Sequence, residues 1–202
     1  MEINRRAPVG RPRGFDADEA LERAMTVFWE QGYEGASLTD LTSAMGVTRK
    51  SMYAAFGNKE TLFRKALERY TEGPAAYAAR ALEKPSAREV ATAFLVGAVS
   101  TTTRPGFPVG CLGVQGSLAA GDSGRVAQDA LIAWREDGRA RLRHRFQQAI
   151  DTGDLPADAD AELLARYVMT VANGIAVQAA SGASRSELQQ VADAALRNWP
   201  PV

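Results

Sequence analysis

Apolar residues recur three or four positions apart along most of this chain, and apolar and polar residues almost never alternate over more than a few positions. The first spacing is that of one face of an α-helix, and the second is that of a half-buried β-strand. The pattern therefore predicts an all-α fold, divided by glycine, proline and capping residues. The expected helices are residues 17–31, a short helix between Ser37 and Gly46, 49–55, a long helix from Lys59, 75–83, 87–102, 109–120, 124–151, 159–181 and 185–198.

Side chains that accept hydrogen bonds from free backbone N–H groups stand at the expected helix starts. Ser37, followed three residues later by Asp40, forms a capping box in which Asp replaces the usual Glu. Gly32 is expected to end the first helix. The capping candidates for the first four helices, in order, are Asp16 or Asp18, Ser37, Thr48 and Asn58.

Two short expected helices are separated by a tight turn that contains Gly46. Ala44 and Val47 are small and apolar where these helices must cross, and glycine tolerates the positive φ of such a turn. This spacing is typical of a helix-turn-helix, whose second helix enters the major groove of DNA. The side chains that this second helix is expected to project outward are Thr48, Arg49, Lys50 and Met52.

The charge distribution fits this interpretation, although 24 basic residues balance 24 acidic ones. Residues 1–14 carry four arginines against Glu2, and residues 41–70 carry six basic residues against two glutamates. A neutral total therefore hides two local basic patches near the N-terminus. Such patches are what a DNA-binding surface requires.

A longer stretch of residues resembles a known family. The run FWEQGYEGASLTDL at 28–41, followed by AMGVTRKSMYAAFGNKETLF at 44–63, resembles the DNA-binding half of TetR/AcrR-family transcriptional regulators. Lys50 and Ala54 depart from the small residue and the aromatic or histidine usual there. The resemblance implies a homodimer that binds a double-stranded DNA operator and represses transcription until a small-molecule effector binds.

The resemblance also implies how the chain is divided. We expect a basic flexible arm at 1–14, a three-helix DNA-binding domain at 15–58, a linking helix at 59–72, and a helical ligand-binding and dimerisation domain at 73–202.

Candidate DNA contacts follow from the same stretch. The resemblance places Thr48 and Tyr53 on phosphates, with Lys59 at a phosphate beside the start of the fourth helix. A lysine at a helix N-terminus is a sound phosphate site in any case. Arg49 and Lys50 are the candidates for reading base edges. The full expected set adds Ser37, Thr39, Met52 and, in a minor-groove arm, Arg11 and Arg13.

The C-terminal half supplies candidates for an effector cavity, since ligand sites combine aromatic walls with a few polar groups. These residues favour a lipophilic or aromatic effector. Oxidation or modification of Cys111 is an alternative trigger, because a helix N-terminus can lower a thiol pKa. The expected ligand contacts are Phe94, Phe107, Cys111, Trp134, Tyr167 and Asn173, and Tyr77 and Phe146 are further aromatic candidates.

The last two expected helices are candidates for self-association. The helix at 159–181 is apolar around much of its circumference and must be covered on two sides. Its alanines and Gly174 permit the close approach of a second copy. The expected dimer contacts are Val168, Val171, Ala172, Ile175, Ala176 and Ala179.

Other functional classes find little support. One cysteine and one histidine exclude an intramolecular disulfide and the His/Cys metal clusters, so we expect no metal and no cofactor. No carboxylate or nucleophile motif indicates an enzyme. No uninterrupted apolar run or apolar leader predicts a membrane segment, so we expect a cytoplasmic protein. A helix-turn-helix protein that senses no ligand remains an alternative.

Overall fold

The computed structural model describes residues 15–115 and 124–200, and every regular element within them is helical, as predicted. The expected arm with Arg11 and Arg13, and residues 116–120 of the expected helix 109–120, lie outside the described residues. The helices are α1 (Ala17–Gly35), α2 (Leu38–Met45), α3 (Arg49–Phe56), α4 (Lys59–Glu72), the 3₁₀ turn η1 (Pro74–Ala76), α5 (Tyr77–Leu82), α6 (Ala87–Thr102), α7 (Leu112–Gln115), α8 (Arg125–Asp151), α9 (Ala161–Ala180) and α10 (Arg185–Arg197).

Local capping contacts fix where the first four helices begin. The Asp16 carboxylate accepts hydrogen bonds from two backbone N–H groups of α1, so Asp16 is the cap there. Ser37 and Asp40 form the predicted capping box of α2. Thr48 and Asn58 each accept a hydrogen bond from the backbone N–H three residues on. The four predicted caps are therefore confirmed.

Two glycines modify the predicted boundaries. Gly32 has a φ of 71° and breaks α1 where its end was predicted, but a last helical turn continues to Gly35. The helix predicted at 109–120 begins only at Leu112. Gly110 takes a φ of 83° and donates its N–H to the Thr102 carbonyl at 2.9 Å, which holds the preceding residues in a turn.

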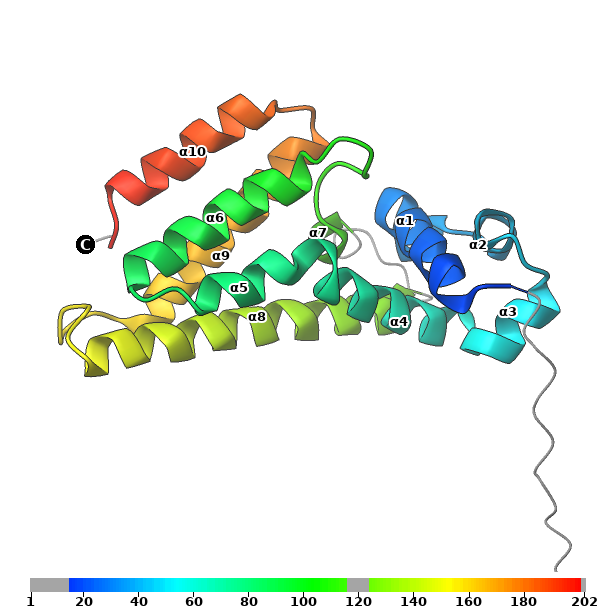
Figure 1. Cartoon of the computed structure of the whole chain (residues 1–202), viewed down its shortest axis with the longest axis horizontal. Coiled ribbons are helices and arrows are strands. Elements are labelled where there is room, and N and C mark those ends of the chain that lie inside the picture. The colour runs from blue at the N-terminus through cyan, green and yellow to red at the C-terminus, as the bar shows by residue number, and fades with distance from the viewer. Residues whose placement is uncertain (1–14, 116–123, 201–202) are drawn as a thin grey trace, which may run out of the picture.

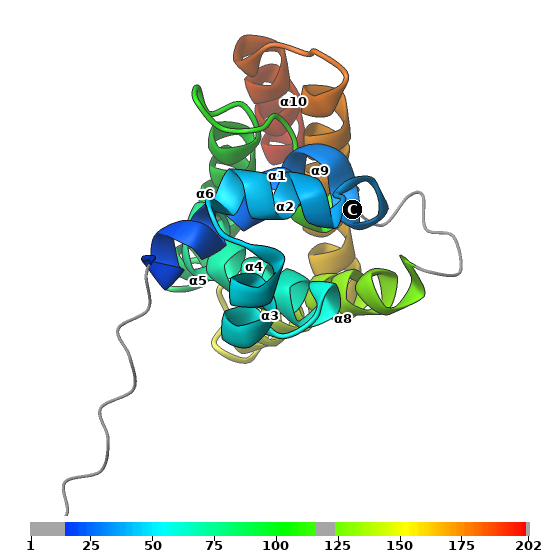
Figure 2. The same ribbon diagram turned by 90° about the vertical axis from the view of Figure 1, so that its right-hand side faces the viewer.

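Figure 1 shows α1, α2 and α3 gathered at one end of the molecule, with α4 leading from them towards the long α8. At the other end α6 packs against α9 and α10, while α8 lies along α9. Figure 2 looks onto the end formed by α1 to α4, with the remaining helices behind it. The molecule thus has a small head and a larger body joined through α4.

The buried apolar side chains form two clusters. The head core consists of the buried apolar side chains between the start of α1 and the end of η1. It also includes Cys111, Leu112, Val114, Ala127, Leu131 and Ala176. The body core consists of the buried apolar side chains of α5, α6 and α10 and those of α9 other than Ala176. It also includes Leu142, Phe146, Ala149, Leu155 and Trp199. Because α7, α8 and α9 contribute to the head core, the two ends of the molecule pack against each other.

Among the described residues one helix, α9, is long and apolar enough by length and composition to cross a membrane. In this fold α9 packs against α6, α8 and α10. The apolar content of α9 is therefore used to build the body core, which is the ordinary place of such a helix in a packed bundle.

Candidate functional site

The turn between α2 and α3 has the geometry that its sequence predicts. Gly46 adopts a left-handed conformation with a φ of 67° and donates its N–H to carbonyls at the end of α2. The Val47 N–H also bonds back, to the Thr42 carbonyl at 3.1 Å. Met45 and Met52, one from each helix, are buried in the head core on either side of this turn. These contacts fix the direction in which α3 leaves the head.

The outer face of α3 is exposed and basic. Arg49 and Lys50 are exposed in its first turn, and Tyr53 is 46% exposed. The Arg49 guanidinium donates to the Thr39 hydroxyl of α2 at 3.1 Å, which lays this side chain across both helices of the motif. The exposed Thr48 hydroxyl caps α3. We call these five exposed side chains, Thr39, Thr48, Arg49, Lys50 and Tyr53, the α3 face.

Met52 and Ser37, two of the expected DNA contacts, do not present free side chains to DNA in the structure. Met52 is 0% exposed, so the expectation that it projects outward is wrong. It lies four residues before Phe56, and this i, i+4 pair forms the inner stripe of α3. Ser37 is exposed, but its hydroxyl is engaged with the Asp40 carboxylate at 2.5 Å. That neighbouring negative charge makes Ser37 a poor partner for a phosphate.

Lys59 begins α4, three residues after the last residue of α3. Its ammonium lies 4.5 Å from the centre of the Tyr33 ring, a cation–π contact that holds the side chain in place. Partial burial lowers the pKa of Lys59, and the nearby Glu34 carboxylate opposes that shift. A lysine ammonium held at a helix N-terminus is well suited to an anion such as phosphate.

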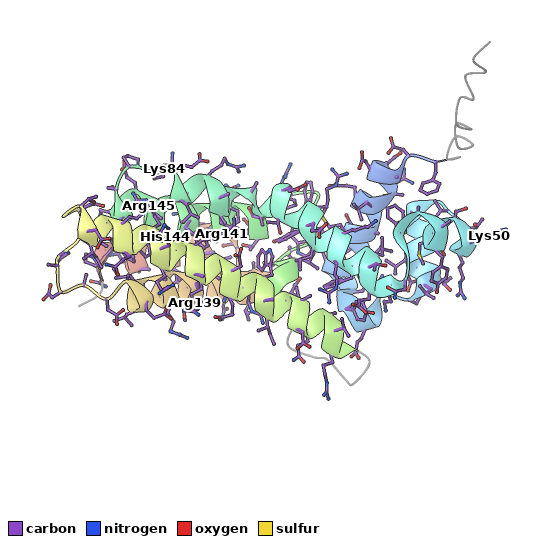
Figure 3. The ribbon with its side chains drawn as sticks, turned by 90° about the horizontal axis from the view of Figure 1, so that it is seen from below. Lys50, Lys84, Arg139, Arg141, His144 and Arg145 are labelled. Carbon is purple, nitrogen blue, oxygen red and sulfur yellow. The ribbon has the colours of Figure 1, made fainter. Side chains whose placement is uncertain are left out.

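The basic run on α8 belongs to a different part of the molecule. Figure 3 shows Lys50 at one end and Arg139, Arg141 and Arg145 on the distant half of α8. Arg139 is paired with Glu136, and Arg141 with Asp137 at 2.8 Å. Arg145 instead donates to the backbone carbonyls of Leu82, Lys84 and Pro85, so all three arginines are engaged within the molecule.

The body contains a partly open cavity of about 110 Å³. Its walls come from the end of α4, from η1 and α5, and from α6, α7, α8 and α9. Phe94, Cys111, Trp134 and Asn173 line it, as the effector hypothesis requires. The other lining residues are Thr71, Ala75, Tyr77, Ala78, Ala79, Leu82, Thr102, Val114, Asp137, Gly138, Arg141, Met169, Ala172 and Ala176.

Three aromatic candidates lie elsewhere. Phe107 packs 6.3 Å from the Trp29 ring, beneath the Arg104 guanidinium, and does not line the cavity. Tyr167 donates its hydroxyl to the Ala195 carbonyl at 3.3 Å, which turns it towards α10. Phe146 is buried in the body core. The expectation that Phe107 and Tyr167 contact a ligand is therefore wrong for this cavity, because the packing of neighbouring helices turns both rings away.

Sequence reasoning missed one contact at the cavity wall that joins α8 to α4. The Trp134 indole N–H donates to the Thr71 hydroxyl at 2.8 Å. A β-carbon added at Gly113 would lie 2.2 Å from the Trp134 ring, so that glycine lets the ring lie directly against α7. Only the fold brings these three positions together, since they are far apart in the sequence.

Cys111 lies where the chain enters α7, and its thiol is buried. The Tyr70 hydroxyl donates to its sulfur at 3.3 Å. Burial raises the pKa of the Cys111 thiol, and the hydrogen bond from Tyr70 only partly opposes this. The shift is opposite to the lowering that the sequence suggested. A helix of four residues has little dipole with which to stabilise a thiolate.

The expected dimer contacts on α9 are mostly turned inward. Five of them are buried within the single chain and pack in its cores: Val168, Ala172, Ile175, Ala176 and Ala179. Val171 is half-buried against the body core. The assignment of the five buried residues to an interface is wrong because α6 and α8 cover this side of α9, whereas that of Val171 stays a prediction. The outward side carries Leu163, 53% exposed, and Val177, 40% exposed.

Comparison with known proteins places both halves of the chain. The family model of bacterial regulatory proteins of the tetR family matches residues 20–66, and that of the tetracyclin repressor-like C-terminal domain matches residues 87–195. The HTH-type transcriptional repressor ComR of Escherichia coli (strain K12) is 34% identical over 197 residues, which is 96% of this chain and 93% of ComR.

Solved structures agree. A cysteine mutant of the TetR family transcriptional regulator CifR, complexed with 26-bp double-stranded operator DNA, is 46% identical to this chain. The match covers 94% of this chain and 100% of that one, with a TM-score of 0.90. A TetR transcriptional regulator from Rhodococcus sp. RHA1 is 45% identical over 93% of this chain and 100% of its own, with a TM-score of 0.62.

Proposed function

The chain belongs to the TetR family of bacterial regulatory proteins, and we propose that it is a homodimeric transcriptional repressor whose operator is released when a small lipophilic or aromatic effector occupies the body. One observation carries this proposal: α4 begins with Lys59, three residues after α3 ends, and near its other end carries Thr71, which lies in the wall of the cavity. A single rigid helix thus leads from the DNA-reading helix to the space for an effector. Such a protein acts on DNA in the cytoplasm.

The α3 face supplies the chemistry for the operator. Arg49 and Lys50 are exposed and point away from the head core, so both can reach base edges in the major groove. Thr48, Tyr53 and Lys59 surround them with hydroxyl and ammonium donors of the kind that bind phosphates. Met52 takes no part, because it holds α3 to the head from inside.

Binding of an effector in the cavity is the step that releases the operator in this proposal. The occupant of the cavity contacts Trp134, whose indole N–H holds Thr71 near the end of α4. Movement of the Trp134 ring is then passed to α4 and changes the separation of the two α3 helices in a dimer. A tenfold loss of operator affinity requires only about 1.4 kcal/mol of coupling, within the usual range for two linked sites.

Modification of Cys111 is the alternative trigger, and the state of its thiol weighs against it. The thiolate is the reactive form of cysteine, whereas burial here favours the neutral thiol. Cys111→Ser separates the two mechanisms. We expect the variant to keep its release by an effector, measured as loss of operator binding. Loss of the response in Cys111→Ser, with Trp134→Ala still responsive, would favour modification.

Dimerisation uses the outward side of α9 and α10 in this proposal. Leu163, Thr170, Gly174 and Val177 follow the spacing of one helix face, and Val191 of α10 is 50% exposed. Open space lies beyond Gly174, so a second copy can approach α9 closely there. Two copies related by a two-fold axis then form a four-helix interface.

The operator-binding experiment begins with duplexes selected from a random pool by the wild-type protein. Arg49→Ala should relax base preference at one position of each half-site and cost about 1–3 kcal/mol per contact. Lys59→Ala should instead weaken binding to all sequences alike and reduce the salt slope by about one.

Lys84→Ala is the matched control, because it removes an exposed positive charge at the end of the molecule opposite Lys50. Its operator affinity should equal that of the wild type. Identical effects of Arg49→Ala and Lys59→Ala on every operator variant would contradict the assigned roles.

A further inference from the structure

The cavity contains a polar group that the fold leaves without a partner. Tyr77 lines the cavity, and its hydroxyl makes no hydrogen bond to any described residue. Two other tyrosine hydroxyls are engaged, that of Tyr70 with the Cys111 sulfur and that of Tyr167 with the Ala195 carbonyl, whereas Tyr33, at the head core away from the cavity, has no such bond among the described residues. Tyr77 is half-buried and its hydroxyl is not among the fully buried unpaired atoms, so a molecule in the cavity can reach it.

The Tyr77 ring is held firmly in place. A β-carbon at Gly97 would lie 2.3 Å from the ring, so Tyr77 rests directly on the backbone of α6. The Phe94 ring meets it edge-on, with 5.6 Å between the ring centres. Because packing fixes the ring, the hydroxyl has little freedom to turn towards another part of the protein.

The protonation of this hydroxyl is also fixed. Burial raises the pKa of Tyr77 well above the ordinary range, and the nearby Cys111 thiol adds to that shift. The group therefore stays a neutral O–H donor at every physiological pH. Its surroundings in the cavity are otherwise largely apolar, with side chains such as Ala172, Ala176 and Met169.

The charged residues of the lining lie at its rim. Asp137 and Arg141 have side chains that are about 60% exposed and form an ion pair at 2.8 Å, so their charges are balanced on the solvent side. A charged effector would lose its hydration on entering and gain no free counter-charge among the described lining residues. The interior therefore favours a neutral occupant.

From this geometry we infer that the effector is a small neutral molecule with an apolar body and one hydrogen-bond acceptor, such as a carbonyl or ether oxygen, which accepts the Tyr77 hydroxyl. The inference rests on the proposed function, whose effector it defines. At about 110 Å³ the cavity is smaller than the cavity of about 150 Å³ that binds benzene elsewhere, so an occupant larger than one small ring requires its walls to move. Bulky polycyclic compounds do not fit it.

The test uses two probes of the same shape, cyclohexanone and methylenecyclohexane, which differ in the presence of the acceptor oxygen. Their affinities for the full-length wild type, Tyr77→Phe and Tyr70→Phe are measured by isothermal titration calorimetry. Tyr77→Phe should weaken cyclohexanone binding about fivefold, the net effect of one hydrogen bond, and leave methylenecyclohexane binding unchanged or tighter. Tyr70→Phe should keep the wild-type ratio of the two affinities, because its hydroxyl is directed at Cys111.

The outcomes separate the inference from the proposed function. If Tyr77→Phe weakens both probes equally, or neither, the tyrosine is structural and the inference is overturned while the cavity stands. If neither probe binds the wild type, both the inference and the proposed effector site fail. If cyclohexanone binds with the expected Tyr77 dependence but leaves the operator bound, recognition stands and the release mechanism fails. Tyr77→Phe keeps the ring that packs on Gly97, so its thermal midpoint should match that of the wild type.

Discussion

The head and the body of this molecule are packed in different ways. The head core is filled by large rings that contact one another: Phe63 meets Phe28 with 5.1 Å and Tyr33 with 5.3 Å between ring centres. The body core is built largely from alanine, valine and leucine on α6 and α9, and it borders a cavity. Close packing makes the head a rigid support for the α3 face, whereas the incompletely filled body can change shape around an occupant.

The two regions meet through aromatic rings next to the cavity. Trp29 and Tyr70 of the head pack edge to face with 4.8 Å between ring centres, and Tyr70 also contacts the Trp134 ring at 6.1 Å. Trp134 in turn lines the cavity. These aromatic contacts therefore connect the cavity wall to the closely packed head.

The largest expected effect is on the packing of the head. Phe63→Ala removes a ring that is 0% exposed and should lower the free energy of unfolding by about 3–5 kcal/mol. Phe94→Ala should cost about 1–2 kcal/mol less, because part of the Phe94 ring already faces the cavity and lacks partner atoms there. Chemical denaturation of both variants checks the difference.

Tyr53→Ala serves as the control for that experiment. Its ring is 46% exposed on α3, so the free energy of unfolding should change by less than about 0.5 kcal/mol. Equal losses for Phe63→Ala and Phe94→Ala would contradict the contrast between a filled head and an incompletely filled body.

The second largest expected effect is on dimerisation, which we assign to the body. Val177→Glu places a charge on the outward side of α9 and should give a monomer in sedimentation velocity. Operator binding should then fall about a hundredfold or more, because the second half-site no longer binds as part of the same molecule. Ile132→Glu is the matched control: Ile132 is 44% exposed but lies on α8. An intact Val177→Glu dimer would place the interface elsewhere.

The sequence predicts the structure of the head better than that of the body, and the reason is physical. The head is defined by signals a few residues apart, such as the capping box at Ser37 and the turn glycine at Gly46, so its helices could be placed from sequence. Met52 was misplaced because a two-turn helix gives too little periodicity to tell its inner side from its outer side. The order of helices in the body was predictable for the same local reasons, including an α6 that matches the expected 87–102.

The contacts of the body were harder to predict because they depend on distant parts of the chain. α9 is apolar on two sides, and its sequence does not show which side α6 and α8 cover; for this reason Ile175 was assigned to a dimer although it is 1% exposed. The aromatic content of the body identified Phe94 and Trp134 correctly as cavity walls but not Phe107. Whether a ring faces a cavity depends on its neighbours, such as the glycine beneath Trp134.

The smallest effect on stability should be the most informative about coupling. Thr71→Val keeps the shape of the side chain but removes the oxygen that accepts the Trp134 N–H. Because Thr71 is exposed, water can replace the lost partner, and the free energy of unfolding should fall by no more than about 1 kcal/mol. The release of operator by an effector should nevertheless weaken, since α4 has lost its hydrogen bond to the cavity wall.

A double-mutant cycle separates the hydrogen bond from the packing around it. Trp134→Phe also removes the bond but additionally changes the cavity wall, so its effect on release should exceed that of Thr71→Val. If the bond couples the cavity to α4, Thr71→Val should add almost nothing to Trp134→Phe, whereas independent contributions would add fully. The quantity compared is the ratio of operator affinities with and without effector, measured for all four proteins. Full additivity would show that the head and the body communicate through the aromatic contacts at Tyr70 and not through this hydrogen bond.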